Sequence, residues 1–241
     1  MSTLILSSGF LAFARHIGVV QACQRHGIVP TRLSGVSSGS LIAALWAAGA
    51  TAADMTAMVL ESPPHHAMRP RFPWGHGGPG LLSLDGFVAR IARRLPARIE
   101  DLPMPFATGV VRRTDGACVL LERGDLAEAI AASCAMPYIF GPRVLDGVSY
   151  VDGGAKDRLF LRPLLERHPA EQTVVHVVSA SQAGRRKRTA EVDAQLDWAA
   201  PKTRLTVLRT PRSGASFFSL GDVPGQIAET EGLVSAALGA R

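Results

Sequence analysis

The sequence predicts an α/β fold, specifically a three-layer α/β/α sandwich built on a central, mostly parallel β-sheet. Short apolar stretches alternate with helical patterns from the first residues, and a unit of strand, tight loop and helix occurs twice before residue 50. A β-branched stretch at 173–179 is typical of a strand buried on both faces. Helices are therefore expected on both sides of the sheet.

The two strand–loop–helix units open the chain. The first has a strand at 4–6 and a helix at about 12–26, which Gly27 ends as a C-cap. The second has a strand at 31–36 and an Ala/Leu-rich helix at 41–48. In both units a short, small-residue loop leads from the end of a strand into a helix.

The rest of the chain mixes helices, hairpins and one long loop. Residues 62–79 have no periodicity and are rich in Pro, Gly and aromatic residues, so we interpret them as a lid or binding loop. The other expected elements are a helix at 51–61 with a capping box of Thr51 and Asp54, a helix at 83–95 capped by Ser83, strands at 106–112 and 118–122 joined by a hairpin turn, a helix at 125–134, a hairpin turn at 146–147, a strand at 204–209 and a closing helix at 227–238.

Length and composition favour one packed domain, for which we take the bounds 1–241. Hydrophobic residues make up 47% of the chain and charged residues 19%, which excludes global disorder. The longest apolar run, at 41–50, is half as long as a bilayer-crossing helix, so none is expected. The start at Met1 lacks a signal-peptide pattern, and three cysteines without C-x-x-C spacing argue against a disulfide framework or a zinc site. We therefore expect a cytoplasmic protein.

The net charge of +6 comes mostly from arginine. It suits anionic membrane surfaces or polyanions, but arginine richness also follows from genomic composition alone, so peripheral membrane contact stays open. The basic run at 185–188 is expected to be a solvated loop, with docking to anionic lipid or to nucleic acid as less favoured alternatives. We expect no nucleic-acid partner, and the oligomeric state stays open.

The most specific motif is Gly35-Val36-Ser37-Ser38-Gly39, a G-x-S-x-G pattern between a predicted strand and a predicted helix. In a nucleophile elbow the serine occupies a strained turn, and small residues two before and two after it let its hydroxyl project above the sheet. The N-terminal N–H groups of the following helix stabilise negative charge at the same place. The alternative is a Gly/Ser turn that only caps the helix.

A serine hydroxyl needs a base within hydrogen-bond reach to act as a nucleophile. One candidate set is Ser37, Asp152 and His176, which follows the chain order of an α/β-hydrolase triad. In that fold several strands precede the serine, whereas here only two do. His176 also lies in the middle of the predicted strand at 173–179, so we interpret it as a buried structural histidine. The alternative is a dyad of a serine and an aspartate.

Further motifs accompany the elbow. They are Tyr150–Gly154, which contains an Asp-Gly-Gly sequence, His16–Val19 in the first predicted helix, Gly80–Leu82 ahead of a helix, and Ala131–Pro137. With these motifs the sequence resembles the patatin-like phospholipases, as a compact bacterial member. The resemblance spans about 3–180 and leaves 181–241 as a C-terminal extension. It implies a patatin-like fold and a serine lipid acyl hydrolase that needs no cofactor and no metal.

By this resemblance, Ser37 is the nucleophile and Asp152 is the base that shuttles the proton in both halves of an acyl-enzyme mechanism. Gly153 and Gly154 permit the sharp turn that aims the carboxylate at the elbow. The alternative for Asp152 is a turn aspartate that caps its own backbone.

The loop after the first strand departs from the family pattern. Family members carry a Gly-Gly-Gly-x-Arg-Gly stretch there, whereas residues 8–13 of this chain read Ser-Gly-Phe-Leu-Ala-Phe. Only Gly9 is left of the glycine run, and Ala12 replaces the arginine. We expect the backbone N–H groups of Gly9 and Phe10, with that of Ser38, to form the oxyanion hole, where loss of one donor typically slows the reaction about 10²- to 10³-fold.

An acyl chain would need an apolar groove, and the candidate wall residues are Phe10, Phe13, Leu41, Trp74 and Phe87. His65, His66 and His76 lack the spacing of a metal motif, and no glycine motif for nucleotide phosphates is present. The expected function is therefore a serine-dependent lipid acyl hydrolase of phospholipase A or lysophospholipase type. Two alternatives stay open: an esterase acting on small soluble esters, and a catalytically impaired lipid-binding protein with a degenerate oxyanion loop.

Overall fold

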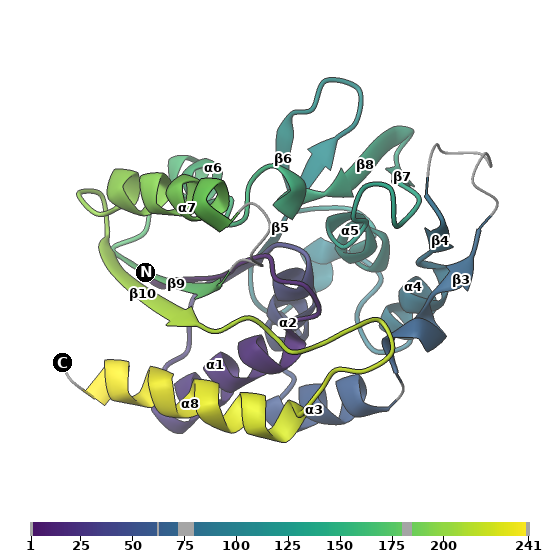
Figure 1. Cartoon of the computed structure of the whole chain (residues 1–241). Coiled ribbons are helices and arrows are strands. Elements are labelled where there is room, and N and C mark those ends of the chain that lie inside the picture. Colours follow the sequence, from purple (N-terminus) through teal and green to yellow (C-terminus); the bar gives the residue numbers. More distant parts are fainter. Residues whose placement is uncertain (1, 62, 72–79, 180–184, 240–241) are drawn as a thin grey trace.

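The computed structural model describes residues 2–61, 63–71, 80–179 and 185–239. Within these residues, eight strands form one mixed sheet (Figure 1). Its parallel part contains, in spatial order, β10 (Arg204–Thr210), β9 (Gln172–Val178), β1 (Ser2–Leu6), β2 (Arg32–Gly35) and β5 (Phe106–Arg112). Its antiparallel part contains β6 (Cys118–Leu121) and β8 (Val148–Asp152), which both pair with β5, and β7 (Arg143–Leu145), which pairs with β8. The prediction of a mostly parallel sheet is confirmed.

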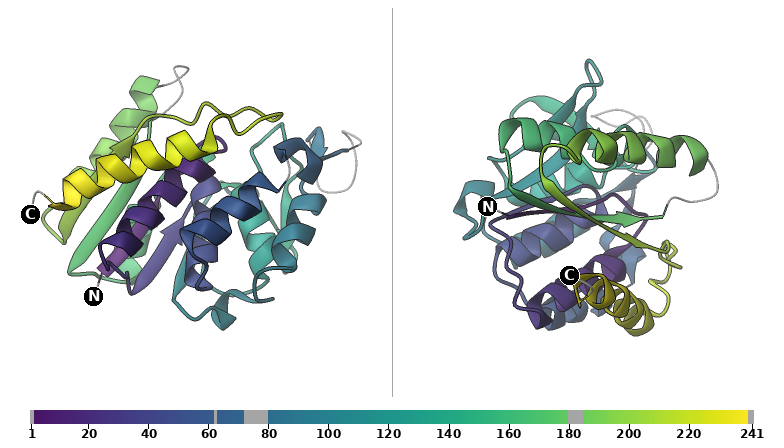
Figure 2. Two further views of the ribbon diagram at one scale, coloured as in Figure 1. Left: turned by 90° about the horizontal axis from the view of Figure 1, so that it is seen from below. Right: turned by 90° about the vertical axis from the view of Figure 1, so that its left-hand side faces the viewer.

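Helices cover both faces of this sheet, which confirms the predicted three layers (Figure 2). One side carries α1 (Phe13–Arg25), α2 (Ser38–Ala47), α3 (Ala52–Leu60) and α8 (Val223–Gly239), and the other carries α6 (Leu161–Arg167) and α7 (Arg185–Ala199). Near the antiparallel strands, α4 (Asp85–Ala92) packs against α5 (Leu126–Ser133). The short elements are the 3-10 turns η1 (Pro64–Ala67), η2 (Ile99–Asp101) and η3 (Gly153–Ala155) and the paired strands β3 (Arg69–Pro70) and β4 (Leu82–Ser83).

Side chains along the central strands point alternately to the two faces of the sheet and so contribute to two hydrophobic cores. In β1, Leu4 and Leu6 belong to the core on the side of α1 and α2, whereas Ile5 belongs to the core beneath α6 and α7. In β9, Val174 and Val175 divide in the same way. Because both faces are covered, each of these strands is buried along nearly its whole length, which explains the β-branched stretch in β9.

The carboxyl ends of β1 and β2 lie side by side, since Leu6 is paired in register with Gly35. Loops that follow adjacent parallel strands meet at the same edge of a sheet. The loop at 7–12 therefore adjoins the turn at Ser37. Pairing with β5 brings Asp152 to the same edge, where it is in register with Val110.

Two predicted helix starts are wrong by a few residues. The helix expected from Leu41 begins at Ser38, because it follows directly from the turn at Ser37. The helix expected from Ser83 begins at Asp85, with Leu84 at the N-cap position. Ser83 belongs to β4, and its hydroxyl accepts a hydrogen bond from the Asp85 N–H at 3.1 Å.

The prediction of a solvated loop at 185–188 is wrong, because α7 begins at Arg185. Basic residues are unfavourable at a helix N-terminus, yet Val192, Leu196 and Ala199 bury one face of α7 in the core shared with α6. This tertiary packing outweighs the local charge pattern. The region at 181–241 also contributes β10 to the main sheet and packs α8 along α1.

Candidate active site

Ser37 lies at the sharp turn between β2 and α2. Its φ of 55° and ψ of −122° are values that residues other than glycine rarely adopt. The turn is held from β5 and α5, because the Ser37 N–H donates to Ser133 Oγ at 2.9 Å and the Ser133 hydroxyl donates to the Gly109 carbonyl at 2.8 Å. Ser133 lies in a stretch that the sequence singled out, but nothing in the sequence indicated this anchoring role.

The two glycines of the elbow motif are required by close backbone approach. A Cβ on Gly35 would collide with the backbone of Gly39, and a Cβ on Gly39 would collide with the Leu6 carbonyl. β1, β2 and α2 therefore meet too closely at this edge for any side chain at these positions. This explains physically why the G-x-S-x-G spacing marks an elbow.

Ser37 and Asp152 are in direct contact. Ser37 Oγ donates to Asp152 Oδ2 at 2.8 Å, and Asp152 Oδ1 accepts from the Gly154 N–H at 2.7 Å. The carboxylate thus caps its own turn with one oxygen and holds the serine with the other. Gly153 and Gly154 make this turn possible, because a Cβ on Gly153 would overlap the β5 backbone and one on Gly154 would overlap Ser8.

The Asp152 side chain is almost completely buried, at 4% exposure. Burial raises the pKa of Asp152 from 3.8 to about 7, against the opposing effects of the hydrogen bonds from Ser37 and Gly154 and of the Arg188 charge. A carboxylate that binds a proton near neutral pH is suited to accept the hydroxyl proton and to return it.

His176 takes no part in this pair. Its Nδ1 shares a 2.8 Å hydrogen bond with His16 Nδ1, and its Nε2 shares one of 2.9 Å with Thr210 Oγ1. Burial lowers the pKa of His16 to about 3 and takes the pKa of His176 well below its usual range, so both rings are neutral. The geometry excludes the Ser37–Asp152–His176 triad and agrees with a buried structural role for this histidine.

The loop at 7–12 is anchored through its carbonyl groups. Arg158 Nη2 donates to the carbonyls of Ser8 at 2.8 Å and Val178 at 2.7 Å, and Ser38 Oγ donates to the Gly9 carbonyl at 2.7 Å. Arg158 is 4% exposed, so these hydrogen bonds are shielded from water. No sequence pattern indicated this role, since the arginine lies about 150 positions away from the loop that it supports.

Anchoring the carbonyls also orients the N–H groups of the loop. In a trans peptide the N–H points opposite to the C=O, so the N–H groups of Gly9 and Phe10 point away from Arg158 and Ser38. Neither N–H, nor that of Ser38 at the start of α2, has a hydrogen-bond partner among the described residues. Gly9, Phe10 and Ser37 border one cavity, which is the arrangement an oxyanion hole needs.

The space that a side chain on Gly9 would occupy is already filled by neighbouring residues. A Cβ there would lie 2.8 Å from Ala12 Cβ and 3.2 Å from Val178 Cβ, so packing alone requires a glycine. Within the loop, positive φ occurs at Leu11, with a value of 45°, and not at Phe10. The backbone therefore accepts a side chain at Phe10, where the family pattern has glycine.

If the N–H groups of the loop at 7–12 bind the oxyanion, we predict that Arg158→Met lowers kcat at least about tenfold with little change in KM, because oxyanion donors act mainly in the transition state. Steady-state kinetics on a soluble ester measure this split. Arg158→Lys keeps the charge and one donor and is expected to recover part of kcat. Unfolding curves on the same preparations serve as the control: a purely structural role would lower the unfolding midpoint without changing the ratio of kcat to KM in the remaining folded protein.

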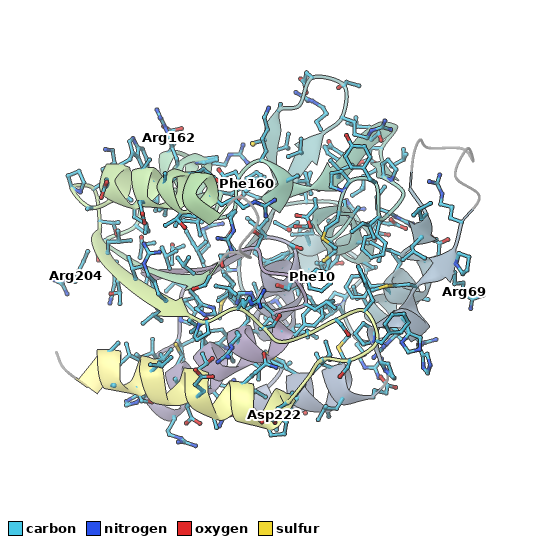
Figure 3. All side chains as sticks on the ribbon, viewed as in Figure 1. Phe10, Arg69, Phe160, Arg162, Arg204 and Asp222 are labelled. Carbon is cyan, nitrogen blue, oxygen red and sulfur yellow. The ribbon has the colours of Figure 1, made fainter. Side chains whose placement is uncertain are left out.

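Two cavities meet at Ser37. The first is apolar, with a volume of about 90 Å³, and is lined by four of the five predicted wall residues: Phe10, Phe13, Leu41 and Phe87. The fifth, Trp74, lies outside the described residues. The long loop adds Met68, and the segment after β10 adds Phe217, whose ring meets that of Phe10 edge to face at 5.0 Å. Figure 3 shows Phe10 at the centre of the molecule, next to this segment.

The second cavity, called the polar cavity below, is larger, at about 440 Å³, and more polar than the first, and it borders Ser37, Asp152 and three arginines. His65 and His66 lie elsewhere, in η1, and His76 lies outside the described residues. Over the ranges that the structure describes, no three metal-binding side chains come together. In the same ranges no helix combines the length and apolar character needed to cross a bilayer.

Comparison with known proteins identifies the class. Residues 4–165 match the family model of the patatin-like phospholipases, so the chain belongs to this family, as the sequence predicted. Its relatives include Uncharacterized NTE family protein Rv1063c of Mycobacterium tuberculosis, 29% identical over 196 residues, which cover 81% of this chain and 53% of that protein. Uncharacterized NTE family protein Rv2565 of the same species is 27% identical over 161 residues, covering 65% and 27% of the two chains.

This chain therefore spans about half the length, or less, of the curated relatives it matches. Among solved structures, VipD from Legionella pneumophila has the same fold, with a TM-score of 0.56 at 14% sequence identity, over 99% of this chain and 66% of that one.

Proposed function

We propose that this protein is a serine lipid acyl hydrolase in which Ser37 and Asp152 form the catalytic dyad. The observation that carries the proposal is the 2.8 Å hydrogen bond to a buried carboxylate from the Oγ of Ser37, which lines an apolar cavity. Gly9, Phe10 and Ser38 supply the N–H donors for the oxyanion in this proposal.

The dyad operates in two halves. Asp152 accepts the hydroxyl proton as Ser37 attacks the ester carbonyl, and the oxyanion of the tetrahedral intermediate binds the free N–H groups. The proton then passes to the leaving alcohol oxygen as the ester bond breaks and the acyl-enzyme forms. In the second half Asp152 takes a proton from water, whose oxygen attacks the acyl carbon, and the proton returns to Ser37 as the fatty acid leaves.

The apolar cavity favours a lipid over a small soluble ester as substrate. Its walls are built from several separate parts of the chain, among them α2, α4 and the segment around Phe217. We expect the affinity for the ester to rise with each methylene added to the acyl chain, because each buried CH₂ contributes about 0.8 kcal/mol. Rates that do not change from two to eight acyl carbons would favour the soluble-ester alternative.

We expect a fluorophosphonate probe to label the native protein stoichiometrically at Ser37, since only an activated serine displaces the fluoride. Mass spectrometry of the digested protein locates the adduct. Hydrolysis of a phospholipid panel is expected to accompany labelling and to persist in EDTA, because no step of the dyad mechanism uses a metal. Absence of labelling in folded protein would support the impaired lipid-binding alternative.

A further inference from the structure

The polar cavity beside Ser37 carries an excess of positive charge. Arg158, Arg188 and Arg212 line it, and Asp152 is the single acidic side chain among the described residues that border it. Arg158 is buried and committed to the carbonyls of the oxyanion loop. Arg188 and Arg212 therefore supply the charge that a ligand can reach.

Both of these arginines are exposed and unpaired. Neither has a hydrogen-bond or ion-pair partner in the part of the chain that the structure describes, whereas the nearby Arg209 is paired with Asp193 at 2.6 Å. The positive charge of Arg188 interacts with Asp152 and opposes the rise in the pKa of this carboxyl group. An anion entering this cavity would thus find two guanidinium groups, with Asp152 as the one carboxylate among the described residues that border it.

The two arginines come from outside the residues that match the family, which end at 165. Arg188 lies in the first turn of α7 and Arg212 follows β10. The pairing of Thr210 with Val178 brings the end of β10 beside the oxyanion loop, and the Ser213 hydroxyl donates to the Phe10 carbonyl at 2.5 Å. This segment of the chain therefore adds its own chemistry to the family site.

We propose that Arg188 and Arg212 bind an anionic phosphate in the part of the substrate on the alcohol side of the scissile ester, so that lipids with a net negative head group are preferred. The inference rests on the proposed function. If the acyl chain occupies the apolar cavity, the carbonyl lies at Ser37 and the rest of the lipid extends into the polar cavity. A guanidinium group binds a phosphate through two parallel N–H···O hydrogen bonds. The positive charge of the two arginines would repel the ammonium of a zwitterionic head group.

The test compares dihexanoyl phosphatidylglycerol with dihexanoyl phosphatidylcholine, both below their critical micelle concentrations. We expect the native protein to show a higher kcat/KM for the anionic lipid. Arg188→Gln and Arg212→Gln are each expected to lower the ratio of the two kcat/KM values about tenfold, as for a hydrogen bond to a charged group. The ratio is the readout because loss of Arg188 also changes the field at Asp152 for both substrates.

Arg204→Gln is the matched control. It removes the same charge, but Arg204 is at the opposite end of β10 from Arg212, and Figure 3 shows it at the edge of the molecule, far from Phe10. We expect its substrate ratio to equal that of the native protein. An equal fall in the ratio for Arg204→Gln would mean that net charge alone sets the preference and would overturn the proposal.

Three further results would also overturn it: a native ratio near one, a ratio that neither site variant changes, or a preference that occurs on phosphatidylglycerol vesicles but not with the monomeric lipids. The last would assign the arginines to a membrane surface. Millimolar inorganic phosphate is expected to compete weakly, since it lacks an acyl chain. Competition as strong as that of the lipid would identify a site for free phosphate.

Binding to Ser37→Ala protein separates this proposal from the proposed function. Calorimetric titration of the two dihexanoyl lipids into Ser37→Ala, with and without Arg188→Gln, measures head-group preference without turnover. If the native protein hydrolyses no ester but the preference in binding remains, the hydrolase proposal fails and the anion site stands. If esters are hydrolysed with no preference for the anionic lipid, the anion site alone fails.

Discussion

Ser37→Ala is expected to reduce lipid ester hydrolysis by at least about 10⁴-fold while leaving the protein folded. Removal of a catalytic serine abolishes both halves of an acyl-enzyme reaction, and measured losses for such residues reach about 10⁶-fold. The turn itself should persist, because its hydrogen bonds involve the Ser37 N–H and the neighbouring backbone rather than the hydroxyl. Hydrolysis of a monomeric phospholipid and the thermal unfolding midpoint measure the two effects.

Ser149→Ala provides the serine control. The Ser149 hydroxyl is buried in β8 and has no hydrogen-bond partner among the described residues, so its removal tests the loss of a hydroxyl that has no proposed role. Its activity and probe labelling are expected to match those of the native protein. A well-folded Ser37→Ala protein with native turnover would rule out the dyad.

Asp152→Asn is expected to abolish activity and, unusually, to stabilise the protein at alkaline pH. The amide cannot accept the serine proton, so we expect a loss of at least about 10³-fold in kcat. Because the pKa of Asp152 rises from 3.8 to about 7 on folding, the stability contributed by the neutral carboxyl is complete below about pH 4 and is lost as the pH rises through 7. Asparagine mimics the neutral carboxyl at every pH.

The stability difference between Asp152→Asn and the native protein should therefore be near zero at pH 4 and about 4 kcal/mol at pH 8 or above, since each pKa unit corresponds to about 1.4 kcal/mol. Denaturant unfolding of both proteins at several pH values measures it, and the buried histidine pair cancels because it is common to both. Native kcat/KM for an uncharged ester should rise about tenfold per pH unit below 7 and level off above it. Activity that is flat from pH 5 to 8, or an Asn variant that is less stable at pH 8, would contradict a buried, proton-accepting Asp152.

The elements of the fold were largely predictable because their signals are local. The strand–loop–helix units, the hairpin turn at Asp146–Gly147 and the capping box of Thr51 and Asp54 follow from residues that are close in sequence. The elbow and the Asp-Gly-Gly turn were predictable for the same reason, since only glycine permits the close backbone approaches found there. The prediction of a loop at the start of α7 was wrong, because α7 buries an apolar face in the core that it shares with α6, and this burial outweighs a basic run that favours a loop.

The sequence by itself thus determined the family, the elbow serine and the candidate aspartate, whose conformational requirements are written into their immediate neighbours. Only the tertiary structure decided which base faces Ser37, because Asp152 and His176 are placed by the order of the strands, and strand order depends on contacts between distant segments. The same holds for Arg158 beneath the oxyanion loop and for Arg188 and Arg212 in the polar cavity. Arg158, for example, binds a carbonyl 150 positions away in the sequence, and burial, pairing and local electric field exist only once the sheet has assembled.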